Sequence, residues 1–153
     1  MAKSSGRRKD TEPRAQIGAL PYRRAADGSV EVMLVTTRET QRWIVPKGWP
    51  MRGLKRHEAA AREAMEEAGV VGEIGRKPVG HYTYRKRLPD SAVLCKVSLY
   101  PLAVSRQLDS WPEQEQRRCQ WFTQMDAADL VDEPSLGEVI RSFQSTPETV
   151  RAE

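Results

Sequence analysis

Hydrophobic residues alternate with polar ones, or run together in short blocks, along most of this chain. Strict alternation is typical of a strand with one buried face, whereas an unbroken apolar block is typical of a strand buried on both faces. The block VMLV at residues 32–35 is the clearest example of the second kind. From these patterns we predict strands at residues 14–23, 30–37, 43–45, 75–87, 92–104 and 118–123.

Two segments carry the period of an amphipathic helix. The first is expected at residues 55–68, with Gly69 as its C-cap and a small apolar stripe of Ala61, Ala64, Met65 and Ala68. The second is expected to be capped by Ser135 and to face the core with Leu136, Val139, Ile140 and Phe143. A short helix is also expected at residues 126–130. Helices on opposite faces of a mixed sheet give an α/β/α sandwich, which is the α/β fold class that we predict.

The length of 153 residues fits one domain with a sizeable core. We expect this domain at residues 14–145, with a disordered tail at residues 1–13 and a frayed end at residues 146–153. No apolar run approaches the roughly 20 residues that span a bilayer, and the first residues lack the apolar region of a secretory signal. We therefore expect a cytoplasmic protein without a membrane partner, in which Cys95 and Cys119 are reduced.

The first predicted helix carries three carboxylates on one face. Glu63, Glu66 and Glu67 stand at positions i, i+3 and i+4, a spacing at which like charges repel and destabilise a helix. A solvated acidic face is one interpretation. The other is a divalent-metal site, because hard cations such as Mg²⁺ take carboxylate oxygens as ligands. The loop containing Pro46 and Gly48 before the helix, and Gly69 after it, favour the metal site.

With these residues the chain resembles the Nudix hydrolases, whose signature is G-x5-E-x7-R-E-U-x-E-E-x-G-U, with U a bulky aliphatic residue. The matching positions are Gly48, Arg62, Glu63, Glu66, Glu67, Gly69 and Val70. Two positions depart from the signature: Leu54 replaces the first Glu, and Ala64 replaces the first aliphatic residue. Such a long motif with fixed spacing is far more specific than a short one.

The resemblance implies an α/β/α Nudix fold and a water attack on a phosphoanhydride bond, assisted by Mg²⁺ or Mn²⁺. It implies that Glu63, Glu66 and Glu67, with the carbonyl of Gly48, hold the metal. It further implies that Arg62 holds the acidic residues in place. Glu67 is our first choice as general base, and Glu63 is the second.

Leu54 leaves two interpretations open. In one, the protein is a catalytically weak module that binds phosphates without cleaving them. In the other, it is an active enzyme in which a neighbour such as Glu58 takes the place of the missing acid.

The segment WIVPKG at residues 43–48 resembles the diphosphoinositol polyphosphate and diadenosine polyphosphate hydrolases of this family. Residues 75–87 hold basic side chains and no acid, which suits a polyphosphorylated small molecule. Candidate phosphate-binding residues are Arg23, Arg38, Arg42, Lys47, Arg85 and Arg87. An RNA 5′ end and an ADP-ribose-type substrate remain alternatives, and the oligomeric state is left open.

Overall fold

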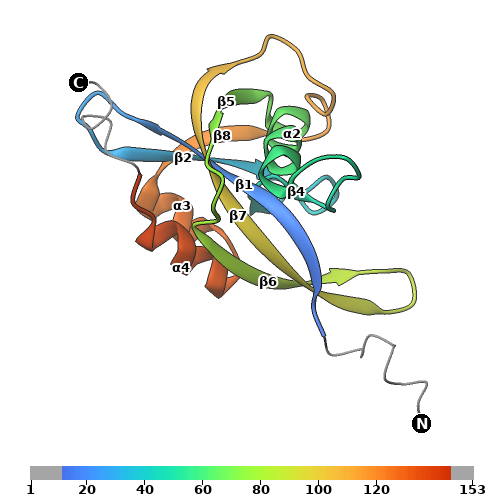
Figure 1. Cartoon of the computed structure of the whole chain (residues 1–153). Coiled ribbons are helices and arrows are strands. Elements are labelled where there is room, and N and C mark those ends of the chain that lie inside the picture. The colour runs from blue at the N-terminus through green and yellow to red at the C-terminus, as the bar shows by residue number, and fades with distance from the viewer. Residues whose placement is uncertain (1–11, 146–153) are drawn as a thin grey trace.

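The computed structural model describes residues 12–145, and these form a mixed sheet with helices on both faces (Figure 1). The strands are β1 (Arg14–Arg24), β2 (Val30–Thr36), β3 (Trp43–Ile44), β4 (Lys47–Gly48), β5 (Val70–Ile74), β6 (Gly80–Arg87), β7 (Ala92–Gln107) and β8 (Cys119–Thr123). The helices are α2 (Arg56–Ala68), α3 (Gln124–Leu130) and α4 (Pro134–Ser142). The predicted α/β/α architecture is therefore confirmed.

The centre of the sheet is the parallel pair of β1 and β7. On its other side β1 pairs antiparallel with β2, and it also pairs with the two residues of β4, with Ile17 opposite Gly48. The long strand β7 pairs with β6 through its first half and with β5 through its second half. Because β4 hydrogen-bonds to the central strand, its backbone has a fixed position in the fold.

Each face of the sheet has its own hydrophobic core, which explains why β1 is buried continuously from Gln16 to Tyr22. On one face α2 packs its alanines against residues such as Ile17 and Met33. On the other face α3 and α4 pack Leu136 and their other buried residues against the sheet. Cys95 is buried, Cys119 is half-buried, and both are free thiols. No helix within residues 12–145 is long and apolar enough to cross a bilayer.

Several predicted boundaries were wrong, in each case for a local reason. The strand predicted at residues 75–87 begins only at Gly80, as β6, because the chain bends after Gly75, which lies against Pro101. Strand β5, which precedes this bend, was not predicted. The last helix begins at Pro134 and not after a Ser135 cap, since proline suits the first helical turn. Helix α2 begins one residue later than predicted, at Arg56.

Smaller differences concern the other elements. The strands β1 and β7 and the helix α3 extend beyond the predicted residues 14–23, 92–104 and 126–130, whereas β2, β3 and β8 are each one residue shorter than predicted. The two-residue strand β4 lies in a segment that was predicted to be a loop. The expected tail at residues 1–13 and the frayed end at residues 146–153 lie almost entirely outside the described residues.

The buried stripe of α2 differs from the predicted one. Ala61 and Met65 are only partly buried, whereas Ala60 and Glu67 are buried together with Ala64 and Ala68. A mostly alanine helix has no large side chain to set its rotation, so contacts with the sheet decide which side is covered. Glu67 is thus a carboxylate on the buried side of the helix.

Candidate active site

Strand β4 meets α2 at Gly48 and Glu63. The carboxylate of Glu63 occupies the space that a Cβ atom on residue 48 would need, so only glycine fits there. The pairing of Gly48 with Ile17 holds this backbone in place. Glu63 is half-buried, and burial raises the pKa of its carboxyl group, with the nearby Glu66 raising it further.

Glu67 lies one helical turn beyond Glu63 and is only 5% exposed. Its Oε1 atom is buried and has no hydrogen-bond partner among the described residues. Burial raises the pKa of Glu67 to about 8, and the charge of Arg117 partly opposes that rise. A buried acceptor without a partner is costly, and a cation or a proton would compensate it.

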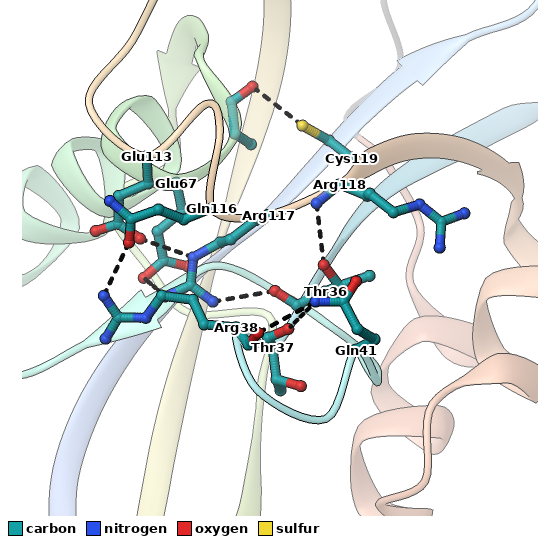
Figure 2. A network of polar contacts seen from close by, with 11 residues as sticks. Thr36, Thr37, Arg38, Gln41, Glu67, Glu113, Gln116, Arg117, Arg118 and Cys119 are labelled. Carbon is teal, nitrogen blue, oxygen red and sulfur yellow. Dashed lines mark hydrogen bonds and ion pairs between the residues drawn. The ribbon is translucent and has the colours of Figure 1, made fainter.

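Arg117, which the sequence analysis did not select, contacts Glu67 directly (Figure 2). Its Nη2 atom lies 3.6 Å from Glu67 Oε2, and its Nε atom lies 2.7 Å from Glu113 Oε1. Nη1 also donates to the backbone oxygen of Thr36 at 3.1 Å. No signature position marks Arg117. The only sequence signal was its place at the end of a polar loop rich in acids.

Residues 108–118, the β7–β8 loop, close over the C-terminal end of α2 (Figure 1). The backbone N–H of Leu108 donates to the Gly69 oxygen at 2.7 Å, and that of Glu113 donates to the Glu66 oxygen at 2.9 Å. The Trp111 ring fills the space beside Gly69, whose φ of 70° is left-handed. Gly69 is therefore required both by its backbone conformation and by its contact with Trp111.

The other motif residues lie around this pair. Glu66 is half-buried and close enough to Glu63 to raise its pKa. Arg62 is exposed, and no hydrogen bond or ion pair of its side chain is found within residues 12–145. Leu54 packs against the core beneath α2. Glu58 accepts a hydrogen bond from the Lys55 backbone at 2.8 Å, so its carboxylate caps the start of the helix.

Among the predicted phosphate-binding residues, Lys47 lies beside the acidic pair. The charge of Glu67 acts on Lys47, although burial is the larger effect and lowers the pKa of the lysine. Arg38 donates to Gln116 of the β7–β8 loop at 3.0 Å (Figure 2). Arg23 is paired with Glu31, at 2.8 Å.

The remaining candidates lie elsewhere. Arg42 forms ion pairs with Asp132 and Glu133, each at 3.3 Å. Arg85 and Arg87 are exposed and alternate along β6 with Lys86, which is half-buried. Since successive side chains of a strand point to opposite faces, Lys86 shares its face with Tyr84 and the two arginines do not. Lys86 also adds to the positive charge around Lys47.

The donor set at Glu63 and Glu67 fits Mg²⁺ or Mn²⁺. It offers carboxylate oxygens, one of them buried and without a partner among the described residues. These oxygens lie next to the backbone of Gly48, where any larger residue would collide with Glu63. Within residues 12–145 no group of three or more His, Cys, Asp or Glu side chains is placed to hold a metal ion. Mg²⁺ does not require one, because it commonly keeps several waters and binds substrate phosphates beside one or two carboxylates.

Comparisons with known proteins identify several similar chains. Nudix hydrolase 21 of Arabidopsis thaliana, described as chloroplastic, is 30% identical over 133 residues, which are 85% of this chain and 66% of that protein. Diphosphoinositol polyphosphate phosphohydrolase 3-beta of Bos taurus is 35% identical over 108 residues, which are 66% of this chain and 60% of that protein. The chain thus spans about two thirds of the length of these relatives or slightly less.

A solved structure shares the fold. A C. elegans Ap4A hydrolase binary complex has a TM-score of 0.63 at 24% identity and covers 91% of this chain and 98% of its own. The profile of the NUDIX domain matches residues 13–143, which is most of the sequence and includes every motif residue described above. On this match, the chain belongs to the Nudix hydrolase family.

Proposed function

We propose that this protein is a metal-dependent pyrophosphohydrolase that cleaves a phosphoanhydride bond by attack of water. The observation that carries the proposal is the Glu67 carboxylate. It is buried, its Oε1 atom has no partner among the described residues, and it lies one turn from Glu63 at the Gly48 backbone. A solvated acidic face would instead have all its carboxylates in water.

Glu63 and Glu67 would hold Mg²⁺ or Mn²⁺, with the Gly48 carbonyl and Glu66 as further candidate ligands. The ion, when bound, neutralises charge on the phosphates and lowers the pKa of bound water. Glu67 Oε2 faces Arg117 and its Oε1 is the candidate metal ligand, so we take Glu63, the second choice from the sequence, as the general base. Lys47 would attract the substrate phosphates to the acidic pair.

The presence of Leu54 in place of the first signature Glu is compatible with catalytic activity. Its side chain packs against the core below α2, and the acidic pair forms without it. Glu58 accepts a hydrogen bond at the start of the helix, so its carboxylate does not take the place of the missing acid. We therefore favour an active enzyme over a module that only binds phosphates.

For the substrate we propose a polyphosphorylated small molecule, either a diphosphoinositol polyphosphate or a dinucleoside polyphosphate. Lys47 lies over the Tyr84 ring, Lys86 adds to the positive charge around it, and the names of two similar proteins refer to these two substrate classes. A densely charged substrate benefits most from such lysines, since each of them acts as a point charge toward phosphate. A cytoplasmic location stays a prediction, supported by the free thiols of Cys95 and Cys119.

The test is a hydrolysis assay of the purified protein with Mg²⁺ and with Mn²⁺. The panel contains an inositol pyrophosphate, a diadenosine polyphosphate, ADP-ribose, a nucleoside triphosphate and a 5′-triphosphate RNA. We expect turnover that is highest on one of the first two and absent in excess EDTA. Full activity in EDTA would overturn the metal-dependent mechanism. Preference for RNA or ADP-ribose would overturn the substrate class alone.

A further inference from the structure

The guanidinium of Arg117 joins three parts of the chain at the candidate site (Figure 2). It contacts Glu67 on α2, Glu113 on the β7–β8 loop and the backbone oxygen of Thr36 at the end of β2, and its side chain is only 10% exposed. A guanidinium presents several donors in a rigid plane, so it can serve acceptors in different directions at once. The side chain is therefore held from several sides.

The segment that carries Arg117 is itself anchored. The Glu113 N–H donates to the Glu66 oxygen of α2 at 2.9 Å, and the Arg118 N–H donates to the Thr36 hydroxyl at 3.0 Å. These bonds tie both ends of the 113–118 segment to the helix and to the sheet. Arg117 thus has a fixed position relative to Glu67, although the two residues are far apart in the sequence.

The contact of Arg117 with Glu67 distinguishes the two oxygens of that carboxylate. Oε2 faces the guanidinium, at 3.6 Å from Nη2, whereas the buried Oε1 has no partner among the described residues. A carboxylate that turned about its last bond would exchange the two oxygens and place the unpartnered one at Arg117. The ion pair with Arg117 thus selects one orientation of the Glu67 carboxylate.

We propose that Arg117 is the positioning residue of this site, which fixes the Glu67 carboxylate so that Oε1 stays available to a divalent cation. Arg62, the arginine of the signature, is exposed, and no contact of its side chain with an acid is found within residues 12–145. The role in turnover rests on the proposed function. The role in cation binding can be measured independently of any substrate.

The experiment is a double-mutant cycle of Arg117→Met and Glu67→Gln, read by the dissociation constant of Mn²⁺. Free Mn²⁺ is counted by its electron paramagnetic resonance signal, with no substrate present. Groups that orient metal ligands typically contribute about 10–100-fold to metal affinity or activity. We expect Arg117→Met to weaken Mn²⁺ binding about tenfold or more, and to add little to the loss already caused by Glu67→Gln.

Arg118→Met is the matched control. Its guanidinium lies 5.3 Å from the centroid of the Trp43 ring and makes no ion pair with an acid in the described residues. This variant should bind Mn²⁺ as the wild type does. For the substrate that is turned over, Arg117→Met should lower kcat about tenfold or more and change KM by less than about threefold, because the substrate is not its partner.

Arg117→Lys serves if the methionine variant does not fold. Its ammonium keeps the charge but cannot reach all three acceptors, so Mn²⁺ affinity should again fall, and fall less in the Glu67→Gln background. Losses that are equal in both Glu67 backgrounds, or wild-type affinity in Arg117→Met, would overturn the proposal. If the wild type binds Mn²⁺ through Glu67 but hydrolyses nothing on the panel, the proposed function fails while the positioning role stands.

Discussion

The ammonium nitrogen of Lys47 lies 4.6 Å from the centroid of the Tyr84 ring. The Tyr84 hydroxyl in turn donates to Gln16 Oε1 at 2.7 Å, so the ring has a fixed orientation beneath the lysine. Such a contact keeps a cation in place when it is partly removed from water. It places a constrained positive charge close to the acidic pair of α2.

We predict that Lys47→Met raises KM more than the double change Arg85→Ala with Arg87→Ala. A charge-assisted contact in a sheltered site contributes about 1.5–3 kcal/mol, or roughly tenfold and more in KM. Exposed arginines on the opposite side of β6 contribute less, under about 1 kcal/mol. Steady-state kinetics on an inositol pyrophosphate at low and high salt measure both effects. A larger KM increase from the arginine pair would show that the substrate lies on their face of the sheet.

The second prediction concerns the two requirements at Gly69. Gly69→Ala places a side chain in a left-handed conformation, which costs about 1–2 kcal/mol, and also displaces Trp111. Gly28→Ala is the matched control, because its φ is 88° but no atom lies within 4 Å of the added carbon. Urea unfolding should therefore show a larger loss of stability for Gly69→Ala. Equal losses would mean that the contact with Trp111 contributes nothing.

The third prediction uses the raised pKa of Glu67. A carboxyl whose pKa is about 8 in the folded state, against 4.5 ordinarily, binds more protons folded than unfolded between those values. Stability contributed by this group is complete at low pH and is lost as the pH rises through that window. In EDTA the melting temperature of the wild type should fall between about pH 5 and pH 8 more steeply than that of Glu67→Gln. At about pH 8, an excess of Mg²⁺ should raise the melting temperature of the wild type again.

Parallel melting curves for the two proteins across that pH range would contradict this assignment. They would mean that Glu67 ionises at the same pH in the folded and unfolded chain. Comparing the two proteins cancels the other titrating groups, which both share. The same Mg²⁺ addition should have little effect on Glu67→Gln.

Much of the fold could be predicted from local pattern. The apolar block at residues 32–35, the alternation along β7 and the acidic helix each carry their own signal, since the period of hydrophobic residues reflects the geometry of one element. Two-residue strands such as β4 carry no such period. Its existence depends on pairing with β1, which is a tertiary contact.

The site was predictable only where the motif is local. Glu63, Gly48 and Gly69 stand at fixed spacings, and the structure brings the first two together. Arg117 approaches Glu67 through the path of the β7–β8 loop, and nothing in the spacing of the chain encodes that path. The burial of Glu67 was missed because an alanine-rich helix does not reveal from its sequence which side faces the sheet.

The most direct test of the central claim compares Glu67→Gln with Glu58→Gln on the preferred substrate at saturating Mg²⁺. Both changes remove one negative charge from α2, but Glu58 only caps the start of the helix, and glutamine can also cap. We predict that Glu67→Gln lowers kcat by about a hundredfold or more, corresponding to about 3 kcal/mol of lost transition-state stabilisation, while Glu58→Gln keeps most of the activity. Wild-type kcat in Glu67→Gln, or an equal loss in both variants, would contradict the account.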